Sequence, residues 1–399
     1  MAGDETMRDR DEGRDGEIPT AVDLSLYYFL FLGSLGSVTN YLPLALMERG
    51  LSLTGLAAML SLIPLMRLGA PALWGYVADR FRMTALLLQW VTWLAFLTYI
   101  PLLWGGPLVT AVLLLLHWFF RIPGVVLADA LAFRRVRLGR GDFGSIRMWG
   151  TVGYVAATLS GGYIAEHLGA GRAVESGIVL LLCAAVLTHR LPRAKPSPTP
   201  PLGPALMVLA RRPAFQAFFV ATFFHFIGQS TYDYFFPVHL ESLGFPKHLI
   251  GIAISLGATM EVLVMWRSRQ LIERLGLERV MLGSAVIAMI RWISTAWVTS
   301  AWPLVMIQVA HGITFGAWYI AAATWVARTA PREINASALA LFSVASFGLG
   351  SLAATGLSAW LGELHGTRVL FAASASTSAL AAMGYWVVMR GSAGVEHGG

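Results

Sequence analysis

Ionisable residues interrupt the long apolar runs of this sequence, and its chemistry is expected at these positions. A charged side chain in a bilayer core costs roughly 2.5–3.5 kcal/mol on insertion scales, so its presence there is a functional hypothesis by default. The ionisable residues within apolar runs are Arg67, Arg121, Asp129, Arg147, Asp233, Glu261, Arg291 and His311. Arginines outnumber carboxylates among them, so the balance is slightly cationic and weakly favours an anionic ligand.

Asp129 and Arg147 are the first candidates for ligand binding. A guanidinium and a carboxylate present fixed donors and acceptors, so they can bind each other when empty and a solute's hydroxyl or carboxylate groups when occupied. The alternative is a structural ion pair near one end of a span. Arg67 and Arg121 are further candidates for lining a cavity, with pairing to a carboxylate of another span as their alternative.

Glu261, Arg291 and His311 are candidates for a protonation switch. Movement of an arginine toward or away from a carboxyl changes the proton affinity of that carboxyl. The alternative is a buried network that joins three spans. Gln229 and Asp233 lie four residues apart and hence on one helix face. Asp233 is a second candidate acid, although it could instead line the external mouth.

The elements that hold these residues are predicted to be membrane-spanning helices. The chain is 56% hydrophobic and 13% charged, whereas a soluble domain carries about 25% charged residues. A span needs about 20 apolar residues. Such runs lie near 24–47, 54–78, 84–104, 107–133, 142–168, 173–190, 213–237, 248–267, 279–299, 302–327, 335–361 and 367–389. The fold expected is therefore an all-α integral membrane protein with twelve transmembrane helices.

The basic residues predict the orientation of these helices. With both termini in the cytoplasm, 21 of the 29 Lys and Arg residues fall on cytoplasmic segments. This bias follows the positive-inside rule and indicates a multi-pass protein of the inner cell membrane. It also explains the net charge of +7 without a nucleic-acid partner. The single cysteine, Cys183, makes neither a disulfide nor a metal site, and we expect no metal or cofactor.

The two halves of the sequence repeat each other. Tyr41-Leu-Pro43, Gly50, Asp79-Arg80 and Gly162 each have a counterpart 194 residues later, at Phe235-Phe-Pro237, Gly244, Glu273-Arg274 and Gly356. Such a repeat indicates two pseudo-symmetric six-helix halves around a midplane site. The predicted divisions are a cytoplasmic tail at 1–23, a half at 24–190, a Pro-rich cytoplasmic linker at 191–212, a half at 213–390 and a tail at 391–399.

These features resemble the major facilitator superfamily. Gly75-x-x-x-Asp79-Arg80 is similar to the signature loop of that superfamily, although it is shorter. The resemblance implies a latch between helix ends that favours the outward-facing state, formed by Gly75, Asp79, Arg80, Glu273 and Arg274.

Two branches of the superfamily are the most similar, the phenylpropionate-permease-like and the lactose-permease-like oligosaccharide:proton symporters. The segment 143–154 resembles the sugar site of the second branch, with Arg147 as its arginine, Asp129 as the acidic partner and Tyr154 in place of the aromatic residue on which a sugar ring stacks. Glu261, Arg291 and His311 match its coupling group. Thr314 stands where that branch carries its proton-carrying glutamate, so Glu261 or Asp233 would have to replace it.

The predicted function is secondary active transport of a small organic solute, a sugar or an aromatic carboxylate, by a monomer that works by alternating access with proton coupling. The substrate-binding set is Asp129, Arg147, Tyr154, Arg121, Arg67 and Gln229. The proton-coupling set is Glu261, Arg291, His311 and Asp233. The alternatives are a uniporter, an efflux carrier and a non-transporting sensor. Neither lysine is followed by Ser or Thr, so the chain has no nucleotide-binding P-loop. It also has no HExxH motif and no protease-like pair of intramembrane acids, so an enzyme is not expected.

Overall fold

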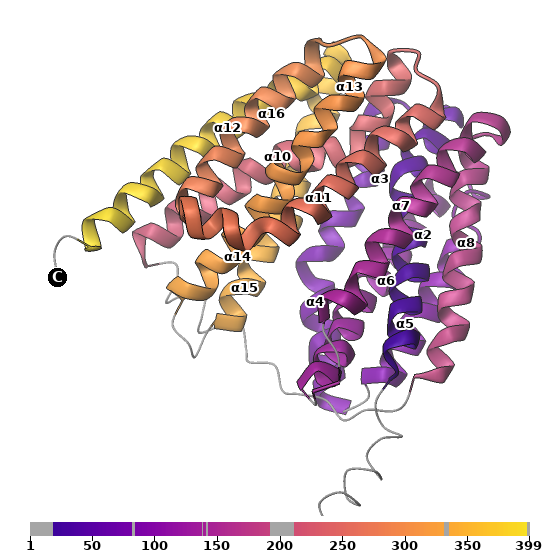
Figure 1. The fold of residues 1–399 in the computed structure, drawn as a ribbon. Coiled ribbons are helices and arrows are strands. Elements are labelled where there is room, and N and C mark those ends of the chain that lie inside the picture. Colours follow the sequence, from indigo (N-terminus) through magenta and orange to yellow (C-terminus); the bar gives the residue numbers. More distant parts are fainter. Residues whose placement is uncertain are drawn as a thin grey trace, which may run out of the picture. The chain divides into compact units, whose positions relative to one another are not determined.

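The computed structural model describes residues 19–81, 84–137, 139–140, 143–191, 211–330 and 335–396 (Figure 1). Every regular element among them is a helix, as predicted. The first set is α2 (Ala21–Glu48), α3 (Leu53–Leu60), α4 (Leu62–Phe81), α5 (Thr84–Tyr99), α6 (Pro107–Arg137), α7 (Phe143–Leu168) and α8 (Ala170–Leu187). The second set is α10 (Pro213–Ser242), α11 (Lys247–Leu275), α12 (Leu277–Trp297), α13 (Ala301–Ile307), α14 (Trp318–Thr329), α15 (Asn335–Ser343) and α16 (Ser351–Glu396).

Eight stretches of the described residues are helical, long enough and apolar enough to cross a membrane. One of them, Leu341–Arg390, covers two predicted spans and contains a kink at Gly366, where φ is 73°. Only glycine adopts this conformation readily, so the helix can change direction there. The chain is thus a multi-pass membrane protein, whereas the count of twelve spans stays a prediction.

Three predicted spans differ in their boundaries. The run 54–78 is broken between α3 and α4 at Ser61, because Pro64 lacks the N–H group that would continue the helix across this point. The run 84–104 ends as a helix at Tyr99, two residues before Pro101. The run 302–327 is divided into α13, a 3₁₀ turn, a π-helical segment at Gly312–Ala317 and α14.

The chain forms two compact units. The described residues of the first are 19–36, 69–81, 84–137, 139–140, 143–157 and 175–191. Within it α5 packs on α6. The indole of Trp74, on α4, donates a hydrogen bond of 3.0 Å to the carbonyl of Phe119 on α6.

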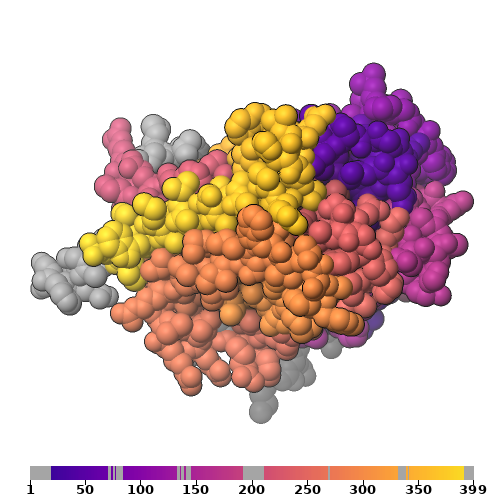
Figure 2. Space-filling view, turned by 90° about the horizontal axis from the view of Figure 1, so that it is seen from above, coloured from indigo at the N-terminus to yellow at the C-terminus, as the bar shows by residue number. Residues whose placement is uncertain are grey.

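The second unit comprises 37–68, 158–174 and the described residues from 211 onward. Its core lies where α16 packs along α10 and α12 (Figure 1), and the yellow surface of α16 runs beside the orange helices of the same unit in Figure 2. Trp318 and Tyr385 are buried in this core and share a 2.7 Å hydrogen bond. The predicted division into an N-terminal and a C-terminal half stays a prediction.

Candidate functional site

Asp129 and Arg147 lie together in the first unit, on α6 and α7. Arg147 Nε is 4.0 Å from Asp129 Oδ1, and each side chain is about one-third exposed (33% and 31%). Tyr28, on α2, donates a 2.6 Å hydrogen bond to the same Asp129 oxygen. The Arg147 guanidinium carbon lies 5.2 Å from the centre of the Tyr28 ring. Three helices thus hold an acid and an arginine whose side chains are partly exposed, so a polar solute could contact both.

Glycines on α7 bring this pair close to α2. A Cβ atom at Gly153 would lie 2.1 Å from the carbonyl oxygen of Phe29. A Cβ atom at Gly150 would lie 2.8 Å from Arg147 Nη1. Small residues at these positions therefore allow the helices to pack closely and leave room for the guanidinium. Tyr154 is half-buried, two turns after Arg147 and so on the same face of α7.

Arg121 does not join this pair. Its side chain is 2% exposed, and Nη2 donates hydrogen bonds to the carbonyl of Phe31 (2.7 Å) and to Ser34 Oγ (2.8 Å) on α2. The guanidinium carbon also lies 4.8 Å from the centre of the Phe31 ring. These contacts fasten α6 to α2, so the geometry favours a structural role for Arg121.

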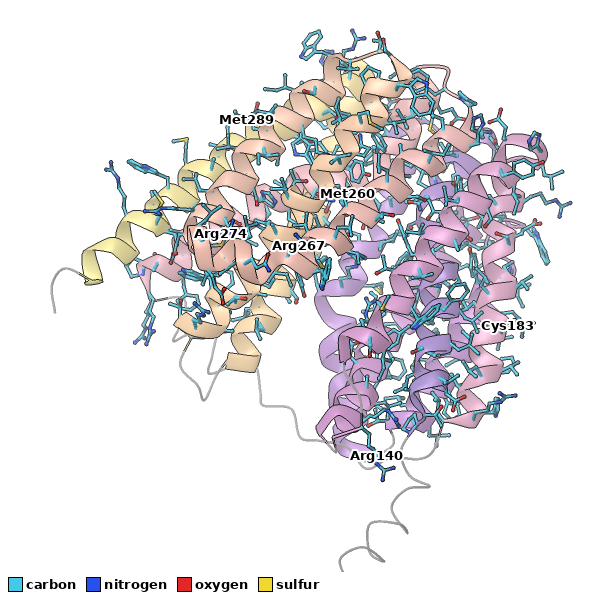
Figure 3. All side chains as sticks on the ribbon, viewed as in Figure 1. Arg140, Cys183, Met260, Arg267, Arg274 and Met289 are labelled. Atoms are coloured by element: carbon cyan, nitrogen blue, oxygen red, sulfur yellow. The ribbon has the colours of Figure 1, made fainter. Side chains whose placement is uncertain are left out.

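In the second unit the structure brings Glu261, Arg291 and His311 together. Arg291 Nη1 donates to His311 Nδ1 at 3.2 Å. The opposite ring nitrogen, Nε2, lies 3.5 Å from Glu261 Oε2. Figure 3 labels Met260, the residue before Glu261, on α11. The imidazole thus connects an arginine on α12 to a carboxylate on α11. His311 itself lies directly before the π-helical segment Gly312–Ala317.

Arg291 is buried and held largely by neutral acceptors. Besides His311, its nitrogens donate to Thr314 Oγ1 (3.0 Å) and Gln308 Oε1 (2.7 Å), and its guanidinium carbon lies 4.3 Å from the Tyr232 ring centre. Thr314 therefore contacts Arg291. It occupies the position at which the symporters that the sequence resembles carry an acid. A hydroxyl there can accept a hydrogen bond, but it does not ionise as a carboxyl does.

Asp233 lies on α10 next to this group. Gln229 Nε2 donates a 2.9 Å hydrogen bond to Asp233 Oδ1, so the predicted i, i+4 pair is present. Asp233 is exposed, whereas Tyr232 and Tyr234 on either side of it are buried. The charged groups that interact with Asp233 include Arg67, Arg291 and Glu261. Because such a charge is not left facing lipid, we assign its exposed side to an interior space.

The predicted latch is not fully within the described part of the structure. Gly75, Asp79 and Arg80 belong to α4, but their side chains lie outside the described residues. Glu273 and Arg274 are exposed at the C-terminal end of α11, where Figure 3 labels Arg274. The latch stays a prediction.

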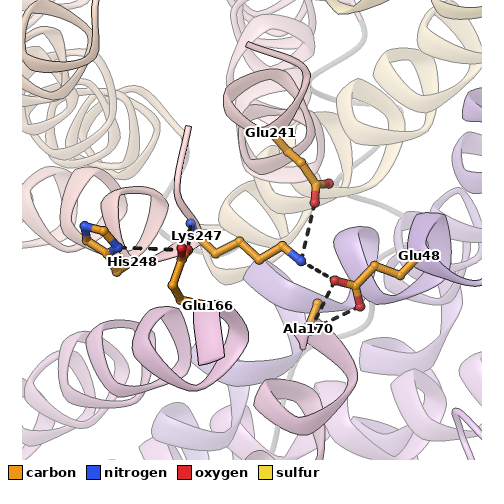
Figure 4. A network of polar contacts seen from close by, with 6 residues as sticks. All are labelled: Glu48, Glu166, Ala170, Glu241, Lys247 and His248. Atoms are coloured by element: carbon orange, nitrogen blue, oxygen red, sulfur yellow. Dashed lines mark hydrogen bonds and ion pairs between the residues drawn. The ribbon is translucent and has the colours of Figure 1, made fainter. Parts of the chain in front are cut away.

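A second polar network, which the sequence analysis missed, surrounds Lys247 at the start of α11 (Figure 4). Its ammonium group pairs with Glu48, at the end of α2, and with Glu241 near the end of α10 at 3.5 Å. The Lys247 backbone N–H donates to Glu166 on α7. Glu48 in turn accepts a 3.1 Å hydrogen bond from the N–H of Ala170, the first residue of α8. We name these contacts the Lys247 network.

The same end of the unit is closely packed around two glycines. A Cβ atom at Gly251, on α11, would lie 2.9 Å from Tyr41 Oη and from the Thr158 carbonyl, and 3.4 Å from Gly162 Cα. Tyr41 donates a 2.5 Å hydrogen bond to that carbonyl. The signal available in the sequence was the position of three acids and a lysine at helix ends, where they can satisfy the unpaired N–H groups of neighbouring helices.

The sequence of the chain matches the model of a known family. The model of the family described as "MFS_1 like family" matches residues 21–373. The chain belongs to this family. It is a membrane transporter of the major facilitator superfamily, and the resemblance found in its sequence is confirmed.

Named relatives of this MFS_1-like chain transport different solutes according to their names. The maltose permease of Geobacillus stearothermophilus is 31% identical over 336 residues, which is 82% of this chain and 84% of the permease. The probable 3-phenylpropionic acid transporter of Escherichia coli (strain K12) is 25% identical over 320 residues, 78% of this chain and 83% of the transporter. The crystal structure of the nucleoside transporter NupG matches with a TM-score of 0.83 and 20% identity, over 92% of this chain and 98% of that one. This last match shows the fold alone.

Proposed function

We propose that this chain is a secondary active transporter that moves a small organic solute across the cytoplasmic membrane by alternating access, coupled to protons. The observation that carries the proposal is the contact of His311 with both Glu261 and Arg291 inside membrane-spanning helices. An acid, a base and a fixed cation in contact can exchange a proton when the distances between them change. The names of the relatives, which are permeases and transporters, support the same class of function.

Proton coupling is assigned to Glu261 and Asp233. Glu261 contacts the imidazole, and its side chain is 25% exposed, so a proton from water can reach it. Asp233 is exposed and hydrogen-bonded to Gln229. Together they supply the acid that Thr314 does not.

We assign solute binding to polar side chains that are partly exposed. In the first unit these are Asp129 and Arg147, with Tyr154 on the same face of α7. In the second they are Arg67 and Asp233, and the buried Gln229 belongs to the set through its hydrogen bond to Asp233. The proposed architecture is twelve spans in two halves with both termini in the cytoplasm. The halves divide at the Pro-rich segment 191–212, and the transporter works as a monomer.

Alternating access requires contacts that break when the site opens to one side. The Lys247 network is the contact to which we assign this role on the external face. It joins the ends of α2 and α7 to those of α10 and α11 through charges rather than through a large apolar core. Ion pairs between partly exposed groups contribute only about 0–1 kcal/mol each, so they can hold one state without trapping it.

A uniporter is the second candidate, and Thr314 is the observation that favours it. Arg291 donates to a neutral hydroxyl at this position. The chain therefore has one fewer acid to carry a proton than the symporters that the sequence resembles. An efflux carrier and a non-transporting sensor of the same fold are the remaining alternatives.

Uptake into proteoliposomes distinguishes these functions. The purified chain would be given maltose, uridine and 3-phenylpropionate with and without an imposed pH gradient, acidic outside. The proposal expects accumulation of one compound only with the gradient, and its loss in Arg147→Ala. Equilibration without accumulation would identify a uniporter. Absence of flux in both directions for all three compounds, in a protein that binds one of them, would identify a sensor.

A further inference from the structure

Two π-helical segments lie in the second unit, at Gly312–Ala317 and Val344–Gly350. π-helical turns are rare and are frequently found at functional sites. Each segment carries one phenylalanine, Phe315 in the first and Phe347 in the second. Their ring centres are 6.5 Å apart.

Glycines hold the backbones of both segments against neighbouring helices. A Cβ atom at Gly312 would lie 2.5 Å from the Met260 carbonyl on α11, and one at Gly350 would lie 2.9 Å from Phe226 Cβ on α10. Such close approach is possible only for glycine. The backbones of the π-helical turns therefore lie directly against α11 and α10.

The rings form a corner. Phe315 stacks on Tyr319, with centres 6.0 Å apart and planes at 14°. The Phe347 ring is turned by 76° relative to Phe315 and by 66° relative to Tyr319. All three are half-buried, whereas Trp318 in the same stretch is fully buried. We name Phe315, Tyr319 and Phe347 the aromatic corner.

The aromatic corner adjoins the ionisable groups of the proposed site. The Arg67 guanidinium carbon lies 5.8 Å from the centre of the Phe347 ring. His311 stacks on Phe315, with centres 5.6 Å apart and planes at 9°, and His311 also contacts Glu261. An arginine and a carboxylate beside these rings indicate that their accessible sides face a polar interior space and not lipid.

We propose that the aromatic corner binds a planar aromatic ring of the solute, while Arg67 binds a polar group on that ring; this rests on the proposed transport function. Aromatic rings prefer offset-stacked and edge-to-face contacts, each contributing about 0.5–1.5 kcal/mol beyond burial. A corner of rings turned by 66° and 76° offers a flat ring both kinds of contact at once. A saturated sugar can pack its C–H groups on one ring, but it lacks the ring quadrupole that favours offset stacking and edge-to-face contact together. The solute class is therefore a small aromatic compound with a carboxylate, carbonyl or hydroxyl group.

Equilibrium binding to the purified full-length protein tests this assignment without depending on transport. The probes are 3-phenylpropionate and uridine, which carry planar rings, and maltose, which does not. We expect both ring-bearing probes to bind and maltose neither to bind nor to compete. Phe315→Leu and Phe347→Leu keep apolar volume but remove a ring, and each should weaken binding by about two- to tenfold.

Two further variants keep the test decisive. Phe347→Tyr retains a ring and should lose less affinity than Phe347→Leu, and it keeps position 347 testable if the leucine variant fails to fold. Phe219→Leu removes a half-buried ring whose neighbours are Phe215 and Phe218 at the start of α10, and it should leave binding unchanged.

Three results would overturn the aromatic corner: binding of maltose alone, ring-probe affinities that both leucine variants leave unaltered, or no binding of either ring probe at millimolar concentration. Ring-dependent binding without flux would instead support the corner and contradict the transport proposal. Flux of a sugar that depends on Glu261 would support the transport proposal and contradict the aromatic corner.

Discussion

The imidazole of His311 lies between an arginine and a carboxylate, with Nδ1 accepting from Arg291 at 3.2 Å and Nε2 lying 3.5 Å from Glu261 Oε2. Because Arg291 can only donate, the neutral ring carries its proton on Nε2 and points it toward Glu261. The tautomer is thus set by the arginine, and a change in the Arg291–His311 distance would change the hydrogen bond that Glu261 receives.

Glu261→Gln is expected to abolish solute accumulation driven by a pH gradient, because an amide cannot take up the proton. Exchange of internal for external solute needs no net proton movement and should persist. The measurement compares gradient-driven uptake with equilibrium exchange in the same proteoliposomes. Glu278→Gln, an acid in the first turn of α12 that belongs to none of the proposed sites, is the control and should behave like the unchanged protein. Full accumulation by the Glu261 variant would remove this residue from the coupling set.

Arg147→Lys is expected to reduce solute affinity by about tenfold or more, although it keeps the positive charge. Lysine lacks the planar fork that can contact Asp129 and a solute together. The apparent affinity should fall and thermal stability should change little, since both side chains are about one-third exposed (33% and 31%). Competition binding on purified protein measures the effect. An affinity equal to that of the unchanged protein would mean that the pair is structural.

Gly150→Ala tests the same site through packing. The added methyl group would lie 2.8 Å from Arg147 Nη1 and 2.4 Å from Leu32 Cδ1, so the guanidinium has to move. Transport should fall by an order of magnitude or more, given the sensitivity of positioned groups to shifts of about 1 Å. Gly283→Ala, on α12, meets no atom within 4 Å and should be harmless. Equal flux in both variants would show that Arg147 need not keep this position.

Lys247→Glu is expected to open the external end, because it places a fourth carboxylate among Glu48, Glu166 and Glu241. Like charges at this distance repel, and the bridge between α2 and α10 is lost. Distances between spin labels on α2 and α11 should lengthen, and the exchange Glu48→Lys with Lys247→Glu should restore them. Arg49→Glu, an exposed neighbour outside the network, is the control. Unchanged distances in the single variant would exclude the network as a closure.

The helical membrane fold was predictable because it depends on composition and on the length of apolar runs. The breaks within runs were less so. Pro64 and Pro101 are visible in the sequence, yet where a helix ends also depends on what it packs against. The π-helical turn after His311 was not predicted from the sequence. Gly312 and Gly316 within it lie close to α11, and this contact depends on tertiary packing.

The pairings within the candidate site were predictable where a family pattern existed. Asp129 with Arg147, and Glu261 with His311, were paired by resemblance, and Gln229 with Asp233 by helical spacing; the structure places all three pairs in contact. Their roles in binding and coupling remain predictions. The Lys247 network was not found because its members come from five helix ends far apart in the sequence, and only tertiary packing brings them together.

The most direct test of proton coupling is to record proton movement caused by solute alone. Proteoliposomes with equal pH inside and outside would receive a solute that the protein binds, with a pH indicator in the external medium. Our account predicts alkalinisation of the medium as protons enter with the solute, and no such change in Glu261→Gln. Solute entry at the normal rate with no pH change in the unaltered protein would contradict it and identify a uniporter.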